Sequence, residues 1–235
     1  MRTGMWERAI AAATAAVFRL VLAFAFFLQQ LGPLPARAAS AIASGKVALV
    51  IGNSAYGKIP DLKNPRNDAG LISDSLKRLG FNVILREDAS HGDIEKAINE
   101  LLVASKDAET VMFYFAGHGF QLGGRNFLVP VDAGLENRDA IGKETFALDK
   151  IIETIHERGK QTLVFLDACR NNPIPAAART VQDAEGLAQI ETGSGTFVAF
   201  ATEPGKVTFD GAGENSPFAT ALSATIESPE FPSPT

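Results

Sequence analysis

Three short apolar runs most constrain what this chain can fold into. Residues 47–51, 111–115 and 163–166 are hydrophobic at every position instead of alternating with polar residues. Strands covered on both faces have this pattern, and such strands usually lie in parallel sheets with helices on each side. The runs therefore predict a three-layer αβα sandwich built on a mostly parallel sheet.

Amphipathic stretches lie between these runs, as expected for crossover helices. In residues 65–79, Ile72, Leu76 and Leu79 recur at helical intervals before Gly80, which suits a left-handed cap. Further helices are expected at 92–104, 146–156 and 217–226, and further strands at 81–85 and 196–201. Residues 39–228 are thus expected to form one domain, with a long loop over 170–195 and a proline-rich tail over 229–235.

The first 38 residues have the features of a secretory signal peptide. Arg2 and Arg8 precede an apolar run over residues 20–28, and Ala36-Arg37-Ala38 has the form of a cleavage site. An uncleaved membrane anchor is the alternative, but the apolar run is about half of the ~20 residues that a spanning helix needs. We expect residues 1–38 to be removed, no stable membrane insertion afterwards, and an exported protein, periplasmic or secreted.

Charge and cysteine content narrow the function. The chain has 27 acidic and 22 basic side chains and a net charge of −5, without a basic run, so nucleic-acid binding is not expected. Exported proteins usually pair their cysteines, yet Cys169 is the only one here, so an internal disulfide is excluded. Cys169 is therefore expected to have another role. The sequence does not fix the oligomeric state.

Two reactive residues follow two of the buried strands. His118 comes directly after the strand expected at 110–115, and Cys169 after the strand expected at 162–166. The carboxyl ends of parallel strands meet at one edge of the sheet, so a thiol and an activating imidazole are expected there. In acyl transfer, the backbone N–H groups of Gly119 and Cys169 are candidates for the oxyanion hole.

The residues around this pair resemble a known family. Tyr114-Phe115-Ala116-Gly117-His118-Gly119 and Leu166-Asp167-Ala168-Cys169-Arg170 are similar to the two catalytic motifs of the caspase-like cysteine peptidases (clan CD, caspase p20-like domain). Residues 47–53, 62–69 and 215–218 extend the resemblance. It implies a cysteine-type endopeptidase that acts on protein or peptide substrates, with His118 and Cys169 as catalytic residues and no required cofactor. No segment matches the family's last strand, so the sheet is expected to lack it.

Asp167 distinguishes this chain from the aspartate-specific caspases, which have glutamine there. In this it resembles the metacaspases and bacterial orthocaspases, in which this aspartate and one equivalent to Asp68 bind an arginine or lysine of the substrate. Two carboxylates suit a guanidinium, although Arg66 lies close enough in sequence to offset part of their charge. The resemblance also implies calcium as an activator in many members, but no EF-hand-like ligand spacing is present, and calcium is left open.

Arg179 lies in the alanine-rich part of the 170–195 loop and is a candidate for self-cleavage if the enzyme cuts after basic residues. Two other functions compete with the peptidase. Residues 52–58 fit the P-loop pattern G-x-x-x-x-G-K, but Ile59 stands where a magnesium-binding Ser or Thr is required. A catalytically silent caspase-like interaction domain is the other alternative.

Overall fold

The fold is seen in a computed structural model that describes residues 45–156, 161–169, 173–174, 186–202 and 213–228, without the Cys169 side chain. The expected signal peptide, the tail at 229–235 and Arg179 lie outside these residues. Within them the elements follow in the order β1 (Lys46–Gly52), α2 (Pro65–Arg78), β2 (Asn82–Glu87), α3 (His91–Ala104), β3 (Thr110–Leu122), β4 (Arg125–Leu128), α4 (Arg138–Glu144), β5 (Phe146–Ala147), α5 (Leu148–His156), β6 (Gln161–Cys169), β7 (Thr196–Phe200) and α6 (Pro217–Ile226).

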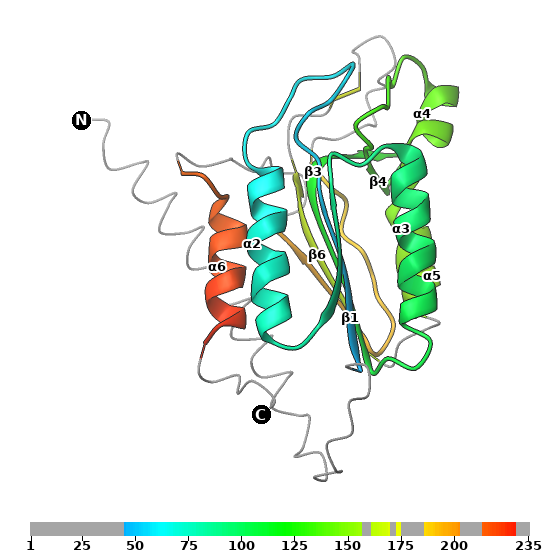
Figure 1. Ribbon diagram of the computed structural model, residues 1–235. Coiled ribbons are helices and arrows are strands. Elements are labelled where there is room, and N and C mark those ends of the chain that lie inside the picture. The colour runs from blue at the N-terminus through cyan, green and yellow to red at the C-terminus, as the bar shows by residue number, and fades with distance from the viewer. Residues whose placement is uncertain (1–44, 157–160, 170–172, 175–185, 203–212, 229–235) are drawn as a thin grey trace, which may run out of the picture. The chain divides into compact units, whose positions relative to one another are not determined.

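Five strands form the parallel part of the sheet, in the order β2-β1-β3-β6-β7. Helices α2 and α6 cover one face, and α3 and α5 cover the other (Figure 1). Both faces of the central strands are buried for this reason, which explains why the apolar runs do not alternate. The predicted αβα sandwich with a mostly parallel sheet is confirmed.

Alternate residues of each strand point into different layers of the core. Leu49, Phe113 and Val164 pack with Leu101 of α3 and Ile155 of α5 in one hydrophobic cluster. On the opposite side, the buried residues of α2 and α6 include Ile72, Leu76, Leu222 and Ile226. The amphipathic spacing of these helices therefore produces a core on both sides of one sheet.

Strand β3 is longer than the sequence predicted. It runs past the expected end to Leu122, turns through Gly123 and Gly124, and pairs in antiparallel fashion with β4. Both glycines have positive φ, 58° and 77°, which a two-residue hairpin turn requires. Strand β4 then pairs with β5, so the predicted helix at 146–156 begins only at Leu148. Strands β4 and β5 and helix α4 were not predicted.

The loop predicted over residues 170–195 has buried anchor points where the structure describes it. Ile174 and Leu187 are fully buried, and Leu187 belongs to the same hydrophobic cluster as α5. The side-chain amide of Asn126 in β4 exchanges two hydrogen bonds with the backbone of Ala188, at 2.7 and 2.8 Å. These contacts fix the segment that precedes β7.

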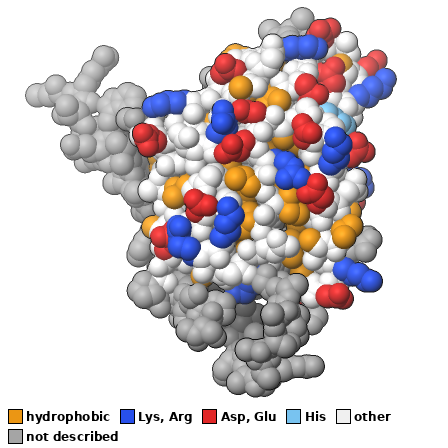
Figure 2. Space-filling view, in the orientation of Figure 1, with side chains coloured by type: hydrophobic (Ala, Val, Ile, Leu, Met, Phe, Trp, Pro, Cys, Tyr) orange, Lys and Arg blue, Asp and Glu red, His pale blue; other side chains and the backbone are white. Residues whose placement is uncertain are grey.

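In the described part of the chain, no strand follows α6, and no helix has the length and hydrophobicity to cross a bilayer. On the face that Figure 2 shows, acidic and basic side chains are interspersed, and neither charge forms an extended area. This face thus carries mixed charge over α2 and α3.

Candidate functional site

His118 lies where β3 changes its pairing. Residues up to Ala116 pair in parallel with β1 and β6, and the register with β6 shifts between Ala116 and Gly119. At Gly117 φ is 156°, and a Cβ there would lie 2.7 Å from the Tyr56 hydroxyl oxygen. Glycine is therefore required at this irregularity, which sets His118 at the carboxyl end of the parallel sheet.

Residues of the loop after β1 hold His118 from two sides. The Tyr56 hydroxyl accepts the His118 backbone N–H at 2.8 Å, and the two rings meet edge to face with centroids 4.7 Å apart. The His118 Nε2 lies 2.8 Å from the Pro60 carbonyl oxygen. A carbonyl only accepts hydrogen bonds, so Nε2 carries the proton of a neutral imidazole and Nδ1 is the nitrogen that can take one up.

Cys169 ends strand β6 directly opposite Gly119, the neighbour of His118. The backbones of the two sequence-predicted catalytic residues are therefore on adjacent strands of one sheet edge. A Cβ on Gly119 would lie 2.8 Å from the Ala168 carbonyl oxygen and 3.1 Å from the Ala168 Cβ. Glycine at this position thus lets β3 and β6 approach closely just before Cys169.

Asp68 and Asp167, the predicted substrate-binding residues, are brought together by one serine. The Ser216 backbone N–H donates to Asp68 Oδ1 at 2.8 Å, and the Ser216 hydroxyl donates to Asp167 Oδ2. Asn215 Nδ2 also donates to Asp68 Oδ1, at 3.1 Å. Both aspartates are 0% exposed. Two carboxylates from α2 and β6 therefore share a buried polar site at the start of α6.

The segment before α6 is also bound to the chain that leads into α2. Lys63 Nζ donates to the Gly213 carbonyl at 3.2 Å, and Asn67 Nδ2 donates to the Glu214 carbonyl at 3.0 Å. Together with the bonds to Asp68, these contacts fix residues 213–216 against the first turn of α2.

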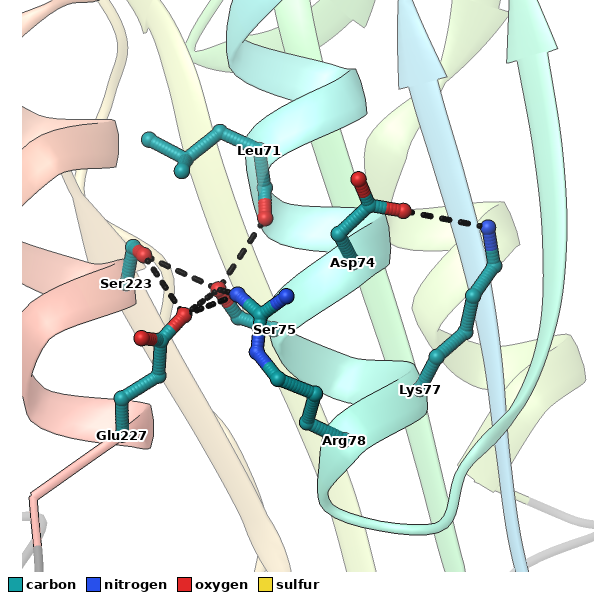
Figure 3. A network of polar contacts seen from close by, with 7 residues as sticks. All are labelled: Leu71, Asp74, Ser75, Lys77, Arg78, Ser223 and Glu227. Carbon is teal, nitrogen blue, oxygen red and sulfur yellow. Dashed lines mark hydrogen bonds and ion pairs between the residues drawn. The ribbon is translucent and has the colours of Figure 1, made fainter.

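The other end of α6 is joined to α2 by a polar network (Figure 3). Glu227, the C-cap of α6, accepts from the Ser75 hydroxyl at 2.6 Å and from the Arg78 guanidinium, and Ser223 Oγ lies 2.9 Å from Ser75 Oγ. The Ser75 hydroxyl, followed by Arg78, holds the pKa of Glu227 below its ordinary value of 4.5. Helices α2 and α6 are thus tied at both ends.

Arg66 forms ion pairs with two carboxylates at the end of β2. Its guanidinium is 3.4 Å from Asp88 and 3.7 Å from Glu87, at the end of β2. The contacts that the structure gives for the Arg66 guanidinium are thus with Glu87 and Asp88.

The backbone contacts of residues 52–58 contradict the P-loop alternative. Its N–H groups would have to cradle a phosphate, but those of Ser54 and Ala55 donate to Asp88 Oδ1 at 2.8 and 2.9 Å. The Tyr56 N–H donates to Asp61 Oδ1, also at 2.8 Å. A protein carboxylate thus occupies the loop, and α2 begins only at Pro65 instead of directly after the motif.

Three residues of the site were missed from the sequence. Tyr56 lies in the loop after the first strand, and Ser216 lies just before the last helix. No sequence pattern marks a hydroxyl side chain as the hydrogen-bond partner of a distant residue such as His118 or Asp167. The Pro60 contact uses a backbone carbonyl, which any residue has, so no sequence pattern identifies it.

Among the described residues, no group of three or more His, Cys, Asp or Glu side chains could hold a metal ion.

An αβα sandwich with a histidine and a cysteine at adjacent strand ends is the architecture of a class of cysteine peptidases. A sequence profile described as the caspase domain matches residues 45–232 of this chain. The chain therefore belongs to the caspase domain family of cysteine peptidases, as the resemblance predicted.

Individual relatives agree with this assignment. The chain is 33% identical over 130 residues to mucosa-associated lymphoid tissue lymphoma translocation protein 1 of Homo sapiens and to its Mus musculus homologue. The aligned region covers 55% of this chain and only 15% of each relative. The crystal structure of caspase-1 from Spodoptera frugiperda superimposes with a TM-score of 0.54 at 18% identity, over 81% of this chain and 75% of that one, and supports the fold alone.

Proposed function

We propose that this chain is a cysteine endopeptidase in which Cys169 is the nucleophile and His118 is its acid–base partner. The observation that carries the proposal is the backbone pairing of Gly119 with Cys169, which supports a catalytic pair of His118 and Cys169 at one sheet edge. The Pro60 carbonyl supports it, because a proton fixed on Nε2 leaves Nδ1 to accept the thiol proton. Membership of the caspase domain family supports the same chemistry.

In the proposed reaction, the Cys169 sulfur bonds to the substrate carbonyl carbon after His118 takes the thiol proton. The N–H groups of Gly119 and Cys169 would stabilise the oxyanion. The carbon–nitrogen bond breaks as His118 returns the proton to the leaving amine. Water, deprotonated by His118, then cleaves the thioester, releasing the acid product and restoring the thiol.

We further propose that Asp68 and Asp167 select arginine or lysine before the cleaved bond. Two carboxylates offer a guanidinium paired, charge-assisted hydrogen bonds and repel an acidic side chain. Both carboxylates are fully buried, so neighbouring groups must give way for a substrate to reach them. Replacing Asp167 with Asn is expected to lower kcat/KM for arginyl substrates, and unchanged kinetics would contradict its role.

One assay tests the enzyme class and the specificity. Fluorogenic peptides ending in Arg, Lys or Asp are incubated with wild type and with Cys169→Ala, with calcium or with a chelator. The expected result is cleavage after Arg and Lys that disappears in Cys169→Ala. Equal activity in the variant would exclude the proposed nucleophile, and an inert wild type would favour the silent interaction domain. The calcium arm shows whether the ion activates this chain.

Export is a separate part of the proposal, supported by the signal-like pattern of residues 1–38. Expression of the full chain with its leader, followed by mass spectrometry of the periplasmic or secreted fraction, is expected to find a protein beginning at Ala39. An intact leader on membrane-bound protein would instead support the anchor.

A further inference from the structure

Ser216 connects three parts of the site, and its hydrogen bonds can be assigned without ambiguity. The Ala219 N–H can only donate, so Ser216 Oγ accepts that bond at 2.9 Å as the N-cap of α6. A serine hydroxyl has one proton, and this proton is directed to Asp167 Oδ2. The Ser216 backbone N–H is directed to Asp68. One fully buried residue therefore sets the position of one carboxylate relative to the other.

We infer that Ser216 is a specificity-determining positioning residue, which holds Asp68 and Asp167 as a fork that fits arginine better than lysine. A guanidinium is planar and donates in a fixed geometry, so its binding depends on the spacing of two acceptors. An ammonium is a compact charge with rotating donors and depends on that spacing less. The inference rests on the proposed function of the two aspartates and adds the residue that sets their geometry.

A helix cap alone does not account for these contacts. Ser90 caps α3 in the same way, but its hydroxyl donates to Asp93 in the first turn of the same helix, at 2.6 Å. The Ser216 hydroxyl instead reaches Asp167 on a strand, 49 positions away in sequence. Ser90 is therefore a matched control, since its replacement removes a cap without changing the contacts of Asp68 or Asp167.

The test measures peptide binding in the Cys169→Ala background, where no cleavage interferes. Acetylated peptide amides ending in Arg, Lys or citrulline, the neutral isostere of arginine, are titrated by calorimetry. Ser216→Gly removes the hydroxyl, and glycine is a residue that helix N-cap positions tolerate. This variant is expected to bind the Arg peptide about tenfold more weakly and the Lys peptide less so. Ser216→Thr, which retains a hydroxyl, should restore the Arg preference, and Ser90→Ala should leave it unchanged.

The outcomes separate this inference from the proposed function. Equal Arg-to-Lys ratios in the parent and in Ser216→Gly overturn the role of Ser216, even if the wild type cleaves after arginine. Binding that favours Arg over citrulline in the parent and loses its Arg-over-Lys preference in Ser216→Gly supports it, even if the wild type cleaves nothing. A folded protein that binds neither basic peptide overturns it. Ser216→Ala provides a second measurement if the glycine variant fails to fold.

Discussion

At the scale of single residues, the Tyr56 hydroxyl joins the backbones of two other segments in the site. It accepts the His118 backbone N–H at 2.8 Å and donates to the Val129 carbonyl at 3.4 Å. Asn53 holds the same region, with its amide bonded to the backbones of Ala89 and Val129. The loops that follow β1, β2 and β4 are thereby joined around the His118 imidazole.

Replacing Tyr56 with Phe keeps the ring against His118 but removes the acceptor of a buried N–H. An unsatisfied buried donor costs about 1–3 kcal/mol, so the free energy of unfolding should fall by about that amount. Urea denaturation followed by circular dichroism measures it. An unchanged midpoint would show that the hydroxyl does not stabilise this position.

The sequence predicted site residues that stand in recognisable motifs and did not predict the residues that contact them. His118, Cys169, Asp68 and Asp167 stand in motifs, and the structure brings Asp68 and Asp167 to one serine. The role of Ser216 depends on how α6 is placed on α2 and β6, which is a matter of tertiary packing that local spacing does not record.

At the scale of elements, the approach of α2 to β1 depends on one glycine. A Cβ on Gly52 would lie 2.6 Å from the Ala69 Cβ and closer still to the Pro65 carbonyl oxygen. The first turn of α2, which carries Asp68, therefore packs directly against the end of β1.

Gly52→Ala should force α2 away from β1 and lower the free energy of unfolding by about 1–3 kcal/mol or more. Gly70→Ala is the matched control, because Gly70 lies within α2 and a Cβ there meets nothing within 4 Å. The control should gain about 0.5–1 kcal/mol from the reduced flexibility of the unfolded chain and the better helix propensity. Thermal denaturation of both variants compares the two effects, and similar shifts would contradict this packing.

The α2–α6 network predicts a pH dependence of stability. Because hydrogen bonds and Arg78 lower the pKa of Glu227 in the folded state, its contribution is present above the ordinary value of 4.5 and is lost as pH falls through the lower folded pKa. The Glu227 side chain is 42% exposed, so the effect should be modest. Denaturation of wild type and Glu227→Gln at pH 7 should differ more than at pH 3. A constant difference would exclude ionisation as its source.

Among the elements, those with strong periodicity were predicted well. The predicted bounds of α6 agree with the structure, and α2 and α3 differ by one residue each. The hairpin of β3 and β4 was missed although Gly123-Gly124 separates two strand-like segments, which is a recognisable turn signal. Short β5 pairs with β4, and Ile141 of α4 packs in one cluster with Phe120 and Phe127 of the hairpin. These contacts join residues that lie far apart along the chain, so local propensity could not reveal them.

At the scale of the whole molecule, β6 and β7 lie on either side of the segment that contains Arg179. They pair in parallel from Thr162 with Thr196 to Leu166 with Phe200. The chain before β7 is also held in place, because Leu187 packs in the hydrophobic core and Asn126 bonds to the backbone of Ala188. The sheet therefore holds both sides of this segment independently of the peptide bonds between them.

If the active enzyme cleaves itself after Arg179, the two fragments should remain together. Mass spectrometry under denaturing conditions would find two masses, and gel filtration under native conditions a single peak. Cys169→Ala and Arg179→Gln are expected to stay intact. Cleavage that persists in Cys169→Ala, or fragments that separate in native buffer, would contradict this prediction.

The position of His118 within β3 determines where the chain can tolerate insertions or deletions. Side chains in a strand alternate between its two sides, so adding or removing one residue between Thr110 and Ala116 would reverse the side on which every later side chain of the strand emerges. The imidazole would then face away from Tyr56 and Pro60 even with its identity unchanged. Changes of length at the Gly123-Gly124 turn, beyond the imidazole, would leave its orientation intact, so new sequence can be accommodated there.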